Sequence, residues 1–286
     1  MLTCRAMRRT KLDLALDWAA AEGWNPGLRD ADAFWAADPE GFLLAELGDA
    51  EPVGCISVVR YGPAFGFLGF YIVRPEWRGQ GHGLALWRAG MARLGDRCVG
   101  LDGVVAQQDN YRRSGFALAH RNIRFGVEQV AAAAAVSPAL PRGMAVVPAA
   151  TLPFAAIAAF DATCFAAPRE AFLRAWLATP GHVALAALRD GRVAGYGVVR
   201  PCRQGAKIGP LFADEADTAV GLFASLAGAA PAGPIFLDVP EPNAAAVALA
   251  RAAGMAPVFE TARMYTRPPP PVRAERVFGV TSFELG

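Results

Sequence analysis

Apolar residues in the first half of the chain follow helical and extended patterns in a mixed order. Leu84, Trp87, Met91 and Leu94 share one face of a helix, which we expect over residues 84–94. The pattern predicts further helices at 12–22, 30–37 and 110–114, a hairpin at 42–60, and strands at 65–73, 98–105 and 121–127. The hairpin favours antiparallel neighbours for the strand that follows it.

The second half of the chain repeats this order of elements. Residues 183–201 show the same strand, polar turn, glycine and strand as residues 42–60, with Gly195 in the position of Gly54. Helices are expected near 153–160, 170–177 and 243–253, with Asn243 as an N-cap, and a strand at 207–212. Matching features at a nearly constant offset indicate a duplication.

The length of 286 residues is sufficient for two domains. An alanine-rich stretch at 131–135 and a proline-flanked one at 138–141 are typical of a linker. We therefore divide the chain into residues 1–130, a linker at 131–142, and residues 143–286. Four prolines at 268–271 predict a stiff connection to a last strand.

Charge and cysteine content exclude several classes of protein. The formal net charge is only +2, which argues against a nucleic-acid-binding surface. The five cysteines form no CxxC pair, so a zinc site or a disulfide framework is not expected. With no long apolar stretch and no apolar leader at the N-terminus, we expect a cytoplasmic protein without a membrane partner.

The segment 73–83 carries the clearest chemical signal. It follows a hydrophobic strand, opens an amphipathic helix, and contains Gly79, Gly81 and Gly83. Glycines allow close approach of the backbone, and a helix N-terminus attracts phosphate, to which Arg78 can add charge-assisted hydrogen bonds. A glycine-rich turn without a ligand and a dinucleotide site remain alternatives, although the preceding hairpin does not fit a βαβ unit.

This loop matches the motif of the GNAT superfamily of N-acyltransferases, which the chain resembles. The motif is an Arg, two residues, a Gly, one residue and a second Gly, and it is matched by Arg78, Gly79, Gly81 and Gly83, where Gly79 is an extra glycine that many members carry. A second family element, a Tyr four residues before Gly-Phe, is matched by Tyr111 and Gly115-Phe116. The resemblance covers roughly residues 2–127.

The resemblance implies a fold of the α/β class, in the broad sense that includes α+β. It has two GNAT-like domains, and each domain is a mixed, mostly antiparallel central sheet flanked by helices. It also implies that acyl-CoA, by default acetyl-CoA, lies in a V-shaped opening between two central strands, without a metal. The pyrophosphate would lie on residues 79–84, and the pantetheine arm would pair with residues 71–73 like an added strand. The implied coenzyme-binding residues are Tyr71, Ile72, Val73, Arg78, Gly79, Gln80, Gly81, His82, Gly83, Leu84 and Asn110.

The resemblance also implies catalytic roles. Tyr111 would protonate the departing thiolate, since a phenol with a pKa near 10 is protonated at neutral pH, and an N–H near Phe70 or Tyr71 would stabilise the oxyanion. Val104 stands where the family often has an Asn, so Asn110 is the candidate for a substitute amide. The strand at 66–73 has no carboxylate. Asp102 is therefore the default candidate for the base, and a chain of water molecules is an equal alternative.

The second half lacks the coenzyme loop. Residues 213–218 contain no glycine or arginine but carry Asp214, Glu215 and Asp217, and Ala250 occupies the position of the tyrosine. These departures imply a domain without its own acyl-CoA, as in tandem GNAT proteins with one catalytic copy. The tail at 277–286 could return to the domain junction and place Glu284 near the amine, or it could only complete the second sheet.

The favoured function is acyl-CoA-dependent N-acylation of a primary amine of a small molecule. A non-catalytic acyl-CoA sensor or scaffold is an alternative, and an aminoacyl-tRNA-dependent transferase is another, against which the nearly neutral first half argues. Neither the acceptor nor the oligomeric state follows from the sequence.

Overall fold

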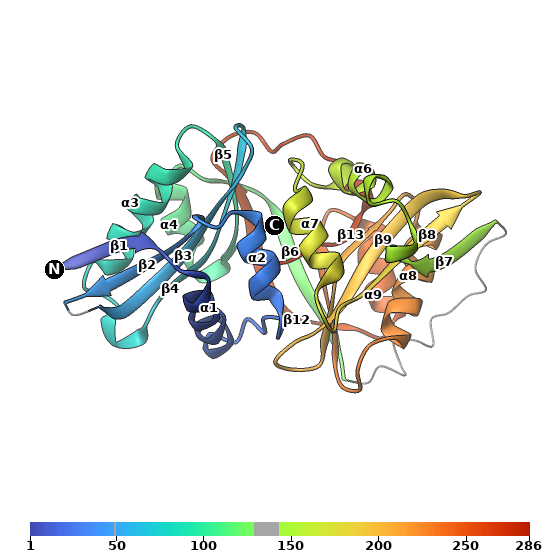
Figure 1. The fold of residues 1–286 in the computed structure, drawn as a ribbon, viewed down its shortest axis with the longest axis horizontal. Coiled ribbons are helices and arrows are strands. Elements are labelled where there is room, and N and C mark those ends of the chain that lie inside the picture. The colour runs from blue at the N-terminus through green and yellow to red at the C-terminus, as the bar shows by residue number, and fades with distance from the viewer. Residues whose placement is uncertain (49, 129–142) are drawn as a thin grey trace.

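The computed structural model describes residues 1–48, 50–128 and 143–286, so the linker expected at 131–142 lies outside the described residues. Two lobes lie side by side, one built from each half of the chain, and the C-terminus lies between them (Figure 1). The pattern of the sequence predicted most of the elements in each lobe. In the described part of the chain, no helix is long and apolar enough to cross a membrane.

In the described residues, the first half forms six strands and four α-helices. They are β1 (Leu2–Ala6), α1 (Arg9–Ala21), α2 (Asp30–Ala37), β2 (Phe42–Leu47), β3 (Glu51–Tyr61), β4 (Phe65–Val73), α3 (His82–Leu94), β5 (Cys98–Val104), α4 (Gln108–Arg113) and β6 (Ala117–Val127). The apolar pattern of the sequence does not predict β1, because this edge strand is mostly exposed and has few apolar residues in alternation.

The second half repeats this order and adds one short strand. Its elements are β7 (Met144–Pro148), α6 (Phe154–Cys164), α7 (Glu170–Ala178), β8 (Val183–Arg189), β9 (Arg192–Pro201), β10 (Ala206–Ala213), α8 (Ala216–Gly228), β11 (Ile235–Pro240), α9 (Ala244–Ala252), β12 (Ala256–Tyr265) and β13 (Val277–Gly279). The Asn243 side chain caps α9 by accepting a hydrogen bond from the Ala246 N–H, as predicted.

A single mixed sheet joins the two lobes, and most of its strand pairs are antiparallel. The strand order is β1-β2-β3-β4-β5-β12-β6-β11-β10-β9-β8-β7, and β13 pairs with β10. Strand β12 of the second half therefore lies between β5 and β6 of the first, and β6 lies between β12 and β11 of the second. Because each half receives the last long strand of the other, both contribute to the centre of the sheet (Figure 1).

The two faces of the first half of the sheet carry different helices. Leu68 and Leu101 pack with Trp87 of α3 and Tyr111 of α4 on one face, which we call the α3 face. The opposite side, the α1 face, is covered by α1 and α2, which pack against side chains such as Phe70. Alternation along each strand sets this division, and an irregularity in the pairing of β4 with β3 places Phe70 on the face opposite Leu68.

Strands β4 and β5 separate part of the way along their length. They pair in parallel only from Phe65–Cys98 to Leu68–Leu101, while β4 continues to Val73 and β5 to Val104. This is the V-shaped opening that the resemblance implied. It connects the α3 face with the α1 face at the centre of the sheet.

The corresponding opening in the second half is filled by the chain itself. Strands β10 and β11 pair in parallel only over residues 206–208 and 235–237. Beyond this point β13 pairs with β10, at Leu211 opposite Gly279, and the Val280 N–H donates to the Asp238 carbonyl of β11 at 2.8 Å. The tail therefore occupies the place where a ligand of this opening would lie.

Candidate functional site

A cavity of about 490 Å³ lies where β4 and β5 separate. Residues from the glycine-rich loop, both diverging strands, α4, β12 and the C-terminal tail line it, so both halves of the chain contribute to its wall. Of the residues expected to bind coenzyme, the cavity is lined by Tyr71, Ile72, Val73, Arg78, Gly79, Gly81, Gly83 and Leu84.

The glycine-rich loop ends in the N-terminus of α3. Gly81 is the N-cap residue, with φ = 84°, and Gly79 has φ = 75°, a region that L side chains rarely adopt. A Cβ added to either glycine would meet no atom of the described residues within 4 Å, so the backbone here is open to a ligand. The first N–H groups of a helix and its dipole attract anions, and this surface therefore suits a pyrophosphate.

The polar side chains of the loop have different environments. Arg78 donates from Nε to the Val73 carbonyl at 2.8 Å and pairs with Glu22 at the end of α1. The Gln80 amide donates to the Glu76 carbonyl at 3.1 Å, and among the described residues neither Gln80 nor His82 belongs to the cavity lining. Trp77, which the sequence analysis missed, does line the cavity.

A bulge in β4 lies at the opening. Cys55 pairs with Ile72 and Ser57 with Gly69, so Phe70 and Tyr71 together face one residue of β3. Phe70 has φ = 44°, a strained conformation for a bulky residue, and its carbonyl accepts a hydrogen bond from Cys55 Sγ at 3.2 Å. Such strain is concentrated at functional sites, and a bulge turns backbone groups out of the ladder.

Tyr111 lies on the α3 face of the opening. Its ring packs so closely on Gly103 that a Cβ there would meet Cε2 at 2.2 Å, and it stacks on Trp87 with 5.8 Å between centroids. Burial, and to a smaller extent the neighbouring phenol of Tyr71, raises the pKa of Tyr111 to about 12. The phenol is therefore protonated at neutral pH.

Asn110, which was expected to bind coenzyme, donates from its side-chain amide to Gln107 Oε1 at 2.6 Å. In the described chain, Gln107 lines the cavity and Asn110 does not.

Asp102 lies on the α1 face with both carboxylate oxygens engaged. Arg263 of β12 donates to them from Nε at 2.8 Å and from Nη2 at 2.6 Å, and Asn122 donates at 2.7 Å. Arg263 reaches Asp102 only because β12 of the second half pairs with β5. The side chain of Asp102 is fully buried, and this bidentate pair stabilises its charge.

Glu284 lies at the same cavity although it is distant in sequence. It is 3 % exposed, lines the cavity, and its Oε1 atom has no hydrogen-bond partner among the described residues. Its carbonyl accepts from Ser57 Oγ at 3.3 Å, and the next carbonyl, of Leu285, accepts from the Tyr61 hydroxyl at 3.0 Å. The tail therefore both completes the second sheet through β13 and returns to the junction.

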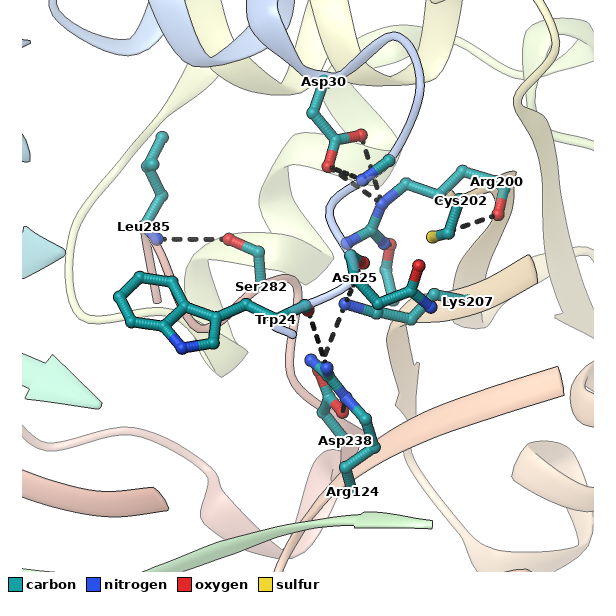
Figure 2. Close-up of polar contacts among 12 residues, drawn as sticks. Trp24, Asn25, Asp30, Arg124, Arg200, Cys202, Lys207, Asp238, Ser282 and Leu285 are labelled. Atoms are coloured by element: carbon teal, nitrogen blue, oxygen red, sulfur yellow. Dashed lines mark hydrogen bonds and ion pairs between the residues drawn. The ribbon is translucent and has the colours of Figure 1, made fainter. Parts of the chain in front are cut away.

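Buried cations of the junction fix the loop that follows α1. Figure 2 shows Arg124 and Lys207 directed at the main chain of this loop, where Arg124 donates to the Trp24 carbonyl at 2.8 Å and Lys207 to the Asn25 carbonyl at 3.1 Å. Asp30, at the start of α2, lies 3.2 Å from Arg200 Nε. These contacts set the position of Trp24, which lines the cavity.

Arg124 also pairs with a carboxylate of the second half. It donates to both oxygens of Asp238, at 2.6 and 2.8 Å. Burial raises the pKa of Asp238, but Arg124 and Lys207 outweigh this effect and hold the pKa below its usual range. Burial lowers the pKa of Lys207, and the charge of Arg124 adds to this. The junction is thus a compact network of opposite charges.

The carboxylates that replace the loop in the second half are bound to their own neighbours. Arg189 donates to Glu215 at 2.5 Å and to Asp217 at 2.9 Å, and Asp214 accepts from the Thr218 hydroxyl at 2.9 Å. Across the described ranges, no group of three His, Cys, Asp or Glu side chains is arranged to hold a metal ion.

Comparison with known families identifies both halves of the chain. Residues 10–117 match the model described as "Acetyltransferase (GNAT) family", and residues 157–279 match the one described as "Acetyltransferase (GNAT) domain". Together the two matches cover most of the sequence.

Similar proteins match nearly the whole chain. Holothin acyltransferase of Pseudoalteromonas sp. (strain SANK 73390) is 31% identical over 274 residues, which cover 94% of this chain and 90% of that protein. A putative acetyltransferase from Pyrococcus horikoshii has a TM-score of 0.82 at 21% identity and covers 100% of this chain and 96% of its own. A tandem GNAT protein from the clavulanic acid biosynthesis pathway has a TM-score of 0.65 at 17% identity, with 94% of this chain and 100% of its own covered.

Proposed function

The chain belongs to the GNAT family of acyltransferases, with two such domains in tandem, and on this premise we propose that it transfers an acyl group from acyl-CoA to the primary amine of a small molecule. The observation that carries the proposal is the cavity between β4 and β5. Its lining includes an open helix N-terminus and the buried Glu284, whose Oε1 atom has no hydrogen-bond partner among the described residues.

The first half supplies the donor site. The N–H groups at Gly81 and the start of α3 bind the pyrophosphate, and Arg78 exchanges Glu22 for a phosphate oxygen. The backbone of residues 71–73 pairs with the pantetheine arm as an added strand, because β5 no longer pairs with β4 there. An N–H of the bulge at Phe70 and Tyr71 stabilises negative charge on the acyl oxygen.

Glu284 is the proton acceptor of the reaction, and Tyr111 is the proton donor. The amine nitrogen forms the amide bond while the bond between carbon and sulfur breaks, and acyl-CoA supplies the activated acyl group. Glu284 accepts the proton of the amine, for which its Oε1 atom is available. Tyr111 donates its proton to the thiolate, since its raised pKa keeps the phenol protonated.

We assign Asp102 a positioning role and not the role of the base. Both of its oxygens accept hydrogen bonds from Arg263, so protonation of Asp102 by the amine would neutralise one partner of a buried ion pair. The pair holds β12 against β5 and thereby fixes the wall of the cavity. The second half binds no acyl-CoA in this proposal, because β13 fills its opening and Glu215 and Asp217 replace the glycines.

The relative named holothin acyltransferase suggests the first acceptor to test. The experiment measures release of free thiol from acetyl-CoA, and from longer acyl-CoA donors, with holothin and with a panel of amines. We expect amine-dependent release with at least one acceptor and acetyl-CoA as the preferred donor. Tight binding of acyl-CoA without turnover on any amine would instead support a sensor, and dependence on charged tRNA would support the third alternative.

A further inference from the structure

The wall of the cavity on the α1 face is aromatic. Trp24 comes from the loop after α1, Phe259 from β12 and Phe283 from the tail, and all three line the cavity. The guanidinium of Arg124 lies behind two of them, 4.9 Å from the centroid of Phe283 and 5.7 Å from that of Phe259. Two of the three rings therefore come from the second half of the chain.

The ionisable groups at this wall would disfavour an acidic acceptor. Three carboxylates line the cavity, those of Glu22, Asp102 and Glu284. The cations near the cavity in the described chain each have a carboxylate partner: Arg78 pairs with Glu22, Arg263 with Asp102 and Arg200 with Asp30, while Arg124 and Lys207 share Asp238. A carboxylate or phosphate on the acceptor would lose its water here without gaining an ion-pair partner.

Two buried oxygens of the wall point to hydrogen bonds with a ligand. Glu284 Oε1 and Thr261 Oγ1 have no partner in the described part of the chain, and the two residues are 3 % and 2 % exposed. Both line the cavity, and buried polar atoms are nearly always paired in the functional state. A carboxylate oxygen and a hydroxyl both accept from the N–H groups of an amine.

We propose that the acceptor is a flat, apolar, ring-bearing amine that carries no carboxylate or phosphate. The inference rests on the proposed acyl transfer and adds the substrate class. The ring packs against Trp24, Phe259 and Phe283, and the amine reaches Glu284 and Thr261. The pocket thereby selects against amino acids, whose carboxylate would face a wall that already contains the carboxylates of Asp102 and Glu284.

The test uses pairs of amines that differ by one carboxylate: tryptamine against tryptophan, and phenethylamine against phenylalanine, with spermidine as an amine without a ring. We expect kcat/KM with acetyl-CoA to favour each ring amine over its amino acid by about 100-fold or more. The amine of an amino acid loses its proton more readily, so this preference cannot arise from the reactivity of the nucleophile. Equal use of the amino acids, or a preference for spermidine, overturns the inference.

Calorimetry separates this inference from the proposed function. Tryptamine and tryptophan are titrated into the protein saturated with CoA. If no amine is acylated but tryptamine still binds more tightly than tryptophan, the acyl transfer fails and the substrate class stands. If tryptamine binds no better than tryptophan, the substrate class fails even when another amine is acylated.

A substitution in the aromatic wall tests whether the ring of the acceptor packs there. Phe259→Leu keeps an apolar side chain but removes the flat ring, so KM for tryptamine should rise about fivefold or more while KM for acetyl-CoA stays within about twofold. Val258→Ala, at the neighbouring position whose side chain is 56% exposed, serves as the control. An unchanged KM for tryptamine in Phe259→Leu contradicts the placement of the ring.

Discussion

At the scale of single residues, the two carboxylates at the cavity differ in what they already bind. Asp102 accepts three hydrogen bonds from Arg263 and Asn122, whereas Glu284 keeps Oε1 without a partner among the described residues. A base must have an oxygen available for the proton that it removes. The hydrogen-bond partners, and not proximity to the opening, therefore distinguish a proton acceptor from a structural ion pair.

Glu284→Gln keeps the shape of the side chain and removes its basicity. We expect kcat to fall by about 10²–10⁴-fold, the usual contribution of a general base, with the affinity for acetyl-CoA nearly unchanged. Thiol release under saturating acetyl-CoA is the measurement. Glu275→Gln, at an exposed position paired with Arg273, is the control. A normal kcat in Glu284→Gln would indicate that a chain of water molecules, and not Glu284, removes the proton from the amine.

Tyr111→Phe removes one hydroxyl and little packing. Turnover should fall by about 10²–10⁴-fold while the affinity for the coenzyme is retained. Because the pKa of Tyr111 is raised to about 12, the wild-type phenol stays protonated, and its ionisation should not reduce kcat between about pH 7 and about pH 10. A variant with wild-type turnover shows that another group protonates the thiolate.

At the scale of elements, the N-terminus of α3 combines several features that suit an anion. Gly79 and Gly81 keep the backbone open, and the helix dipole is directed at the cavity. These features depend on the local chain alone, which explains why the sequence motif located them.

Gly81→Glu places a carboxylate on this helix N-terminus. We expect the Kd for acetyl-CoA to rise at least about 100-fold, or about 2.7 kcal/mol, because the new charge occupies the phosphate position. The matched control is Gly95→Glu at the other end of α3, another glycine of positive φ with open space around it. Calorimetry gives both affinities, and equal affinities in the two variants contradict the phosphate site.

The C-terminal tail, residues 277–286, is part of the buried core. Val277, Phe278, Phe283 and Leu285 are all buried, so removal of the residues after Thr266 would expose apolar surface in both halves. Loss of activity on truncation would therefore report unfolding as readily as loss of the acceptor site. Point substitutions such as Glu284→Gln test the tail more cleanly.

At the scale of the whole molecule, the two openings of the sheet have different contents. The one between β4 and β5 is a cavity, whereas β13 fills the one between β10 and β11. We expect a saturating titration of the wild type to give one equivalent of acetyl-CoA per chain. Two equivalents would show that the second half also binds the coenzyme.

Two partly buried histidines make the stability of the molecule sensitive to acid. Burial, and then the charge of Arg263, lowers the pKa of His120 to about 4, and burial and Arg200 do the same for His182. The unfolded chain takes up these protons near pH 6.5, well before the folded protein does. These two groups therefore leave stability unchanged above about pH 6.5 and reduce it as the pH falls towards 4.

Urea unfolding at about pH 7 and about pH 5 measures this effect. The free energy of unfolding should fall by up to about 1.4 kcal/mol per pH unit for each histidine. His182→Gln should show a shallower dependence on pH than the wild type, whatever its absolute stability. An identical pH dependence in the variant would show that His182 does not take part.

The sequence by itself determined most of the helices and strands and the duplication, and it located the glycine-rich loop before α3. Residues 30–37 and 65–73 formed the predicted helix and strand with the predicted bounds. These features depend on interactions between neighbours in the chain, namely apolar periodicity, glycine conformation and the start of a helix, and a local pattern records them directly.

Only the tertiary structure decided which groups surround the cavity. The exchange of β6 and β12 that brings Arg263 to Asp102 depends on pairing between strands that are far apart in the sequence. The position of Glu284 also depends on long-range contacts, because this residue reaches β3 and β4 of the first half from the far end of the sequence. No local pattern encodes such contacts, because the free energy that fixes them comes from packing between distant segments.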